Sequence, residues 1–142
     1  MSKYAVLGNP VSHSKSPLIH SLFAKQTNQA MSYTAIPLEE GDFDDFVRSF
    51  FAEGGAGLNV TVPFKGNAFA LAASCSPRAQ LAKAVNTLFL DDEGNICGDN
   101  TDGIGLVTDI RQNNGVDLSG QRLLILGAGG AVRGALAALV YE

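Results

Sequence analysis

The feature that most restricts the fold is an alternation between short apolar runs and segments with helical periodicity. Residues 4–7 form an apolar run that ends at a Gly-Asn-Pro turn, as a strand followed by a loop does. Residues 31–37 and 57–62 repeat this strand pattern, and segments with apolar residues three and four apart lie between them. Strands that alternate with helices predict an α/β domain with a mostly parallel sheet flanked by helices.

Local signals place the first helices. Ser16-Pro17 is predicted to open a helix, with Ser16 as the N-cap and Pro17 as the first helical residue. One apolar face then follows at helical spacing, formed by Leu18, Ile19, Leu22 and Phe23. A second helix is predicted after Gly41-Asp42, and shorter helices are predicted at residues 64–73 and 77–83.

The second half of the chain indicates a change of domain. Residues 86–90 and 95–97 flank an Asp-Asp-Glu-Gly turn and predict a hairpin, and residues 103–112 predict a helix. Residues 121–126 have the composition of a buried strand and lead into an Ala/Leu-rich helix. We therefore expect a first domain over residues 1–102, a linking helix and loop over 103–120, and the start of a second domain over 121–142.

Composition excludes several classes of protein. The 142 residues are 46% hydrophobic and 17% charged, with a net charge of -4, which is ordinary for a globular protein. No basic face indicates a nucleic-acid partner, and the apolar runs are too short to span a membrane. The N-terminus lacks the pattern of a signal peptide, so a cytoplasmic location is expected. Two cysteines and two isolated histidines give no spacing typical of a metal site.

A glycine-rich turn lies between the last strand and the last helix. Glycine lets the backbone approach a pyrophosphate, and the free N–H groups of a helix N-terminus attract its charge. The match to the usual dinucleotide fingerprint is partial, because Val132 stands where the third glycine would be, and a purely structural turn is the alternative. The turn consists of Gly127, Ala128, Gly129, Gly130 and Ala131.

Polar residues at predicted strand ends and helix starts form the other candidates. Ser14 and Ser16 precede a helix N-terminus, where a carboxylate would be stabilised, although capping alone would also explain them. Asn59 and Thr61 lie two residues apart, on one face of a strand end, and Lys65 follows them. Lys65 is either a solvated surface charge or part of a ligand site at the carboxyl ends of the strands. Asp102 either caps the next helix or pairs with Lys65.

Six motifs occur in an order that resembles the shikimate dehydrogenases, and they extend over the whole chain. They are Gly8-Asn9-Pro10, Ser14-Lys15-Ser16-Pro17, Asn59-Val60-Thr61-Val62-Pro63-Phe64-Lys65, Ala84-Val85-Asn86-Thr87, Gly98-Asp99-Asn100-Thr101-Asp102-Gly103 and Gly127-Ala128-Gly129-Gly130-Ala131. Six motifs in order are more specific than any one of them. The resemblance implies a substrate-binding domain followed by the first βα unit of a Rossmann NADP-binding domain.

The resemblance also implies the role of each residue. Ser14 and Ser16 would hold the substrate carboxylate, and Lys65 and Asp102 would be catalytic. The ring hydroxyls would be bound by Asn59, Thr61, Asn86 and Asp102. Thr101 and Lys65 are also expected to line the substrate-binding cleft. The NADP pyrophosphate would lie over Gly127, Ala128, Gly129, Gly130 and Ala131.

The activity that the resemblance implies is the reversible reduction of 3-dehydroshikimate to shikimate with NADPH. A quinate/shikimate dehydrogenase that uses NAD and a non-catalytic domain that binds a small carboxylate are the alternatives. A folate-interconverting dehydrogenase of similar architecture is disfavoured, because the serine pair suits a small carboxylate. Family members continue beyond residue 142, so the chain is expected to be inactive alone. Its C-terminal unit is expected either to self-associate, for example in a homodimer, or to be disordered in solution.

Overall fold

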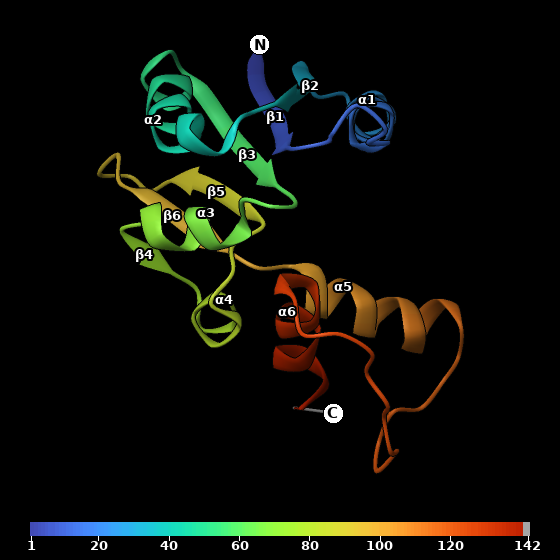
Figure 1. Cartoon of the computed structure of the whole chain (residues 1–142). Helices are drawn as coiled ribbons and strands as arrows, with labels where there is room; N and C mark the ends of the chain where they lie inside the picture. The colour runs from blue at the N-terminus through green and yellow to red at the C-terminus, as the bar shows by residue number, and fades with distance from the viewer. Residues whose placement is uncertain (141–142) are drawn as a thin grey trace.

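A six-stranded sheet is built from residues 2–99, and the computed structural model describes residues 1–140 of the chain (Figure 1). The strands are β1 (Ser2–Gly8), β2 (Met31–Pro37), β3 (Gly55–Val60), β4 (Ser74–Cys75), β5 (Thr87–Leu90) and β6 (Ile96–Asp99). The α-helices are α1 (Ser16–Gln26), α2 (Phe43–Ala52), α3 (Lys65–Leu71), α4 (Pro77–Ala82), α5 (Asp102–Thr108) and α6 (Gly130–Leu139). Two short helical turns complete the set, η1 (Glu40–Asp42) and the π-helical η2 (Asp109–Asn113).

The sheet is mostly parallel, as the alternation of strands and helices predicts. The strand order is β2-β1-β3-β5-β6-β4, and only β5 runs antiparallel to its neighbours. The carboxyl ends of β1, β3 and β6 therefore meet at one edge of the sheet, where β5 begins. Asn59 pairs with Thr87 at this edge, and Thr87 pairs with Asp99. Open α/β sheets bind their ligands at such an edge.

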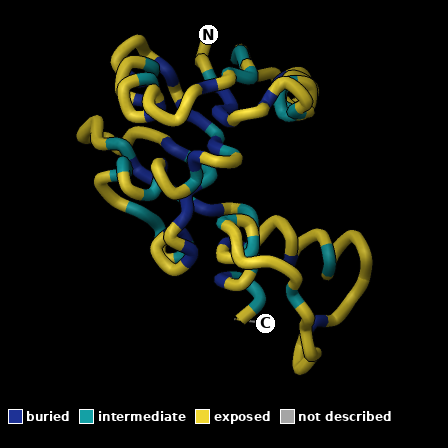
Figure 2. The backbone as a smooth tube through the Cα atoms, viewed as in Figure 1, coloured by how far each residue is buried: buried dark blue, intermediate teal, exposed yellow. Residues whose placement is uncertain are grey.

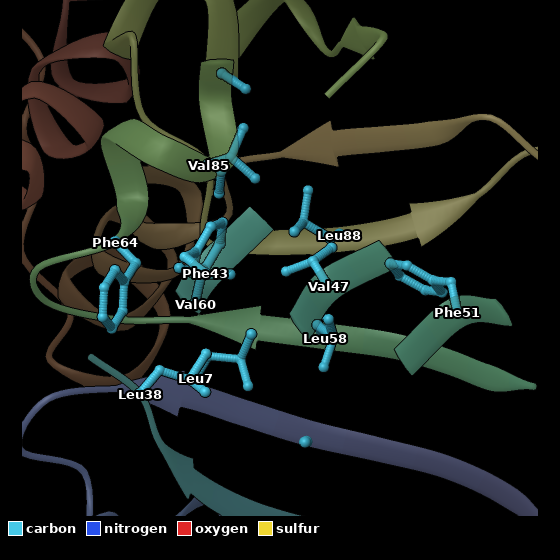
Figure 3. Close-up of a cluster of buried hydrophobic side chains, with 13 residues drawn as sticks. Leu7, Leu38, Phe43, Val47, Phe51, Leu58, Val60, Phe64, Val85 and Leu88 are labelled. Carbon is cyan, nitrogen blue, oxygen red and sulfur yellow. The ribbon is translucent and has the colours of Figure 1, made fainter. Parts of the chain in front are cut away.

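One face of the sheet carries the hydrophobic core. Helix α2 contributes Phe43, Val47 and Phe51, whose spacing of four residues places them on the side that faces the strands (Figure 3). The Phe43 ring stacks on Phe64, with ring centroids 5.1 Å apart. Since Phe64 directly precedes Lys65, this packing anchors the start of α3 at this edge of the sheet.

The opposite face is covered less completely. Helix α1 packs beside β2, but its predicted apolar face is exposed rather than buried, with Leu18 59% and Phe23 54% accessible. Ala24 is the residue of α1 that is buried, and Figure 2 shows most of this helix as exposed. A hollow of about 330 Å³ lies on this face, and its lining includes Tyr4, His20 and Tyr33.

The chain beyond the sheet contains two helical segments joined by a long loop, and one prediction for it is wrong. The helix expected at residues 103–112 is present as α5 and η2, and the last helix is present as α6. The buried strand predicted at residues 121–126 is not formed, and Leu124 and Leu126 are each 87% exposed. A strand exists by pairing with a neighbour, and no strand among residues 1–140 pairs with this segment.

None of the helices within residues 1–140 is long and apolar enough to cross a lipid bilayer.

Candidate functional site

An ion pair forms the centre of the candidate site. Lys65 is the first residue of α3 and Asp102 the first of α5, so two helix starts bring their side chains together. Lys65 Nζ lies 2.6 Å from Asp102 Oδ2, and the side chains are 16% and 30% exposed. A charge-assisted hydrogen bond in such a half-buried position orients both groups. The carboxylate also offsets the unfavourable position of a cation at a helix N-terminus.

Asn86 joins this pair from the segment before β5. Its Nδ2 donates to Asp102 Oδ1 at 2.8 Å and to Thr101 Oγ1 at 2.9 Å, and its Oδ1 accepts from the Thr101 N–H at 3.1 Å. The Asn86 N–H donates to the Asp99 carbonyl at 3.0 Å, which fixes this segment to the end of β6. Four of the predicted residues, Lys65, Asn86, Thr101 and Asp102, therefore lie in one hydrogen-bonded network.

Asn59 lies next to this network, at the end of β3. Its Nδ2 donates to the Asn86 carbonyl at 3.4 Å, and its Oδ1 accepts from the Tyr33 hydroxyl at 2.6 Å. Burial raises the pKa of Tyr33 to about 12, although a hydrogen bond with Ser16 opposes this shift, so the hydroxyl stays protonated and donates. Tyr33 was not among the residues predicted for the site. Its place on β2 gave no signal of this role, because Tyr33 lies near the start of that strand and not at the edge where the strand ends.

The serine pair lies in a pocket of about 310 Å³ whose lining includes Ser14, Ser16, His13 and Thr61. The prediction that Ser16 caps α1 is wrong, because Lys15 is the N-cap residue and no side chain caps this helix. Ser14 Oγ instead accepts a hydrogen bond from the Ser16 N–H at 3.2 Å. Because the Ser16 side chain does not cap the helix, its hydroxyl is free of that role and lines the pocket.

The glycine-rich turn ends close to Lys65. Gly127 has a φ of 125°, which side-chain-bearing residues rarely adopt. Helix α6 begins at Gly130 with Gly129 as its N-cap and with no side-chain cap, so its first N–H groups have no capping side chain. A Cβ built on Gly130 would lie 4.0 Å from Lys65 Cβ. The turn and the ion pair are therefore neighbours.

Asp99 ties the end of β6 to helix α4. The guanidinium of Arg78 donates to it from Nε at 2.7 Å and also from Nη2, and Ser76 Oγ donates to it from the start of α4. The Arg78 hydrogen bonds are the main reason that the pKa of Asp99 falls to about 2. This carboxylate is charged at neutral pH and has a structural role.

Among residues 1–140, no group of three or more acidic, histidine or cysteine side chains could hold a metal ion.

Comparison with known proteins identifies the family. The chain matches the model of the shikimate dehydrogenase substrate binding domain over residues 6–88, which is more than half of its length. The chain belongs to the shikimate dehydrogenase family. Shikimate dehydrogenase (NADP(+)) of Marinobacter nauticus is 59% identical over 139 residues, and that of Aeromonas salmonicida is 57% identical over 142 residues.

Solved structures of shikimate dehydrogenases have the same fold. The shikimate 5-dehydrogenase of Thermus thermophilus, in complex with NADP(H) and shikimate, matches 99% of the chain with a TM-score of 0.90 and 35% identity. The Ael1 enzyme of Pseudomonas putida matches 99% with a TM-score of 0.93 and 52% identity. The chain covers 50% of the Marinobacter relative and 52% of each of these structures, so it spans about half the length of the proteins it matches.

Proposed function

We propose that the whole protein to which this chain contributes reduces 3-dehydroshikimate to shikimate, reversibly, with NADPH. By whole protein we mean a polypeptide in which residues 1–142 are followed by the second half that the relatives possess. The observation that carries the proposal is the Lys65–Asp102 pair, which Asn86 holds at the ligand-binding edge of the sheet beside the glycine-rich turn. The pair supplies a proton donor and an orienting carboxylate in one place.

The polar groups of the edge suit the two ends of such a substrate. A carboxylate fits the pocket of Ser14 and Ser16, where hydroxyls meet the positive end of the α1 dipole. Ring hydroxyls fit the amide, hydroxyl and carboxylate groups of the neighbouring network, since these can both donate and accept. In this proposal those groups belong to Asn59, Asn86, Thr101 and Asp102, and the Thr61 hydroxyl joins them from the serine pocket.

The residues of the glycine-rich turn fit a dinucleotide. Among the described residues, nothing lies within 4 Å of a Cβ built on Gly129, so a phosphate could approach its backbone. The backbone N–H groups of the turn and of the start of α6 would bind the pyrophosphate, from residues Gly127, Ala128, Gly129, Gly130 and Ala131. When bound, the nicotinamide supplies the hydride, and the protein supplies position and proton transfer.

Lys65 is the proton donor in this proposal. As the carbonyl carbon gains the hydride, its oxygen becomes an alkoxide and takes a proton from Nζ. Asp102 accepts a hydrogen bond from Lys65 and aims Nζ at this oxygen. General acid–base catalysis of this kind requires donor and acceptor within hydrogen-bond reach.

An assay of the purified whole protein tests the function. The forward assay follows the oxidation of NADPH in the presence of 3-dehydroshikimate at a fixed enzyme concentration. The reverse assay supplies shikimate or quinate together with either NADP or NAD. We expect turnover with 3-dehydroshikimate and NADPH. Faster reaction with quinate and NAD would favour the quinate/shikimate alternative. Shikimate binding in calorimetry without turnover would favour a non-catalytic carboxylate-binding domain.

The organisation of the protein follows from the same proposal. Residues 1–102 form the substrate-binding domain, 103–120 link the domains, and 121–142 begin a Rossmann domain for NADP. The segment 121–126 would then become a strand when the remaining strands of that domain are present to pair with it. A cytoplasmic location suits a reaction that depends on the NADPH pool.

The isolated 142-residue chain is expected to self-associate through its C-terminal unit, because Leu124 and Leu126 are almost fully exposed. Light scattering should give a mass above that of the monomer, and replacing both leucines with serine should restore the monomer. The matched control replaces Leu18 and Leu22, which are exposed on α1. Dissociation by the α1 control alone, or a monomeric parent chain, would contradict the proposed interface.

A further inference from the structure

Asn100 is a buried polar residue directly behind the ion pair. It is 2% exposed, and its side chain makes two hydrogen bonds to main-chain groups. Nδ2 donates to the Ala84 carbonyl at 2.9 Å, and Oδ1 accepts from the Asp102 N–H at 3.1 Å. A buried carboxamide that satisfies one donor and one acceptor in this way holds both partners in fixed positions.

The two partners belong to the segments that carry the candidate catalytic groups. Asp102 opens α5, and Ala84 lies two residues before Asn86. Val85, which lies between Ala84 and Asn86 in the sequence, donates its N–H to the Lys65 carbonyl at 2.9 Å. Asn100 therefore connects the backbone of Asp102 to the segment of chain that also fixes Lys65 and Asn86.

Helix α6 closes the space behind the carboxamide. A Cβ built on Gly134 would lie 3.0 Å from Asn100 Oδ1, 3.2 Å from Nδ2 and 3.4 Å from Asp102 Cβ. Arg133 Nε donates to the Ala82 carbonyl at 3.1 Å, which ties α6 to the same segment. The carboxamide thus lies between this segment, α5 and α6, and it also lines a cavity of about 710 Å³ between α4, α5 and α6.

We propose that Asn100 is a positioning residue. Its carboxamide fixes the Asp102 backbone against Ala84 and thereby keeps the Asp102 carboxylate between Lys65 and Asn86. The side chain is 2% exposed and both of its hydrogen bonds go to main-chain groups, so it acts through Asp102 rather than on the substrate. This inference rests on the proposed function and adds to it a residue that orients the pair from behind.

The test is a double-mutant cycle in the whole protein. We expect Asn100→Ala to lower kcat/KM for 3-dehydroshikimate by about 10- to 100-fold, the scale of a displacement of about 1 Å at the reacting groups. Adding Asp102→Asn should cost less than the product of the two single effects, because both remove the same orientation. The control cycle pairs Asn100→Ala with Ser16→Ala, at the other end of the site, and there the effects should multiply. Multiplicative effects in both cycles would show that Asn100 has a general structural role only.

Two further measurements decide the role of Asn100 if the alanine variant does not fold or if the wild-type protein shows no turnover. If Asn100→Ala does not fold, as judged by circular dichroism, Asn100→Ser replaces it in both cycles. If the wild-type whole protein shows no turnover, the proposed function fails, and crystal structures of wild type and variant decide the role of Asn100. A variant in which Lys65 Nζ and Asp102 Oδ2 separate beyond about 4 Å, the usual limit of an ion pair, supports the proposal. A pair that keeps the wild-type distance overturns it.

Discussion

Replacing Lys65 with alanine in the whole protein is expected to lower kcat by roughly 10²- to 10⁴-fold, the range for loss of a general acid. The alkoxide that forms on hydride addition would then have to take its proton from water. KM should change less, because the groups that bind the carboxylate and ring hydroxyls remain. Steady-state kinetics with 3-dehydroshikimate and NADPH measures both parameters.

Two further variants are compared with Lys65→Ala. Lys25→Ala removes an exposed lysine of α1 and should leave both parameters unchanged. Asp102→Asn should lower kcat and raise KM, since it removes the partner of Lys65 and a substrate acceptor together. If Lys65→Ala left kcat within a few fold and raised only KM, Lys65 would be a binding residue, and another proton donor would have to be sought.

The strand and helix pattern was predictable from the sequence because most elements carry a strong local signal. The strand over residues 31–37 and the helix from Gly130 follow from apolar runs, turns and glycine alone. The two-residue strand β4 was missed, since a pair as short as Ser74 and Cys75 has no periodicity. Whether residues 121–126 form a strand depends on which strands are available to pair with them, and local sequence cannot state that.

The candidate site was predictable only in part, for a similar reason. Motif order and strand-end placement were enough to select Lys65 and Asp102, which the structure brings within 2.6 Å of each other. Tyr33 lies outside the motifs, and Asn100 lies inside one of them without any indication of its partner. Tyr33 reaches Asn59 although β1 separates their strands in the sheet, and Asn100 bonds Ala84 across sixteen positions of sequence. Contacts between distant segments follow from topology and packing rather than from local pattern.

The close approach of α5 and α6 leads to the second large effect. Gly103 is buried where the two helices meet, and a Cβ built on it would lie 2.2 Å from the Gly134 carbonyl oxygen and 2.8 Å from Ala138 Cβ. The carbonyl belongs to a helix backbone and cannot rotate away. Gly103→Ala must therefore move the helices apart. Overpacking of this kind costs about 1–3 kcal/mol.

Gly105→Ala is the matched control, because it lies on the same helix with nothing within 4 Å of its built Cβ. This variant should be stabilised by up to about 1 kcal/mol, since alanine favours a helix interior over glycine. Urea unfolding of the whole protein should thus shift in opposite directions for the two variants. Gly103→Ala should also raise KM for NADPH, because separating the helices moves the glycine-rich turn away from Lys65. Equal stability of the two variants would mean that α5 and α6 do not pack this closely in solution.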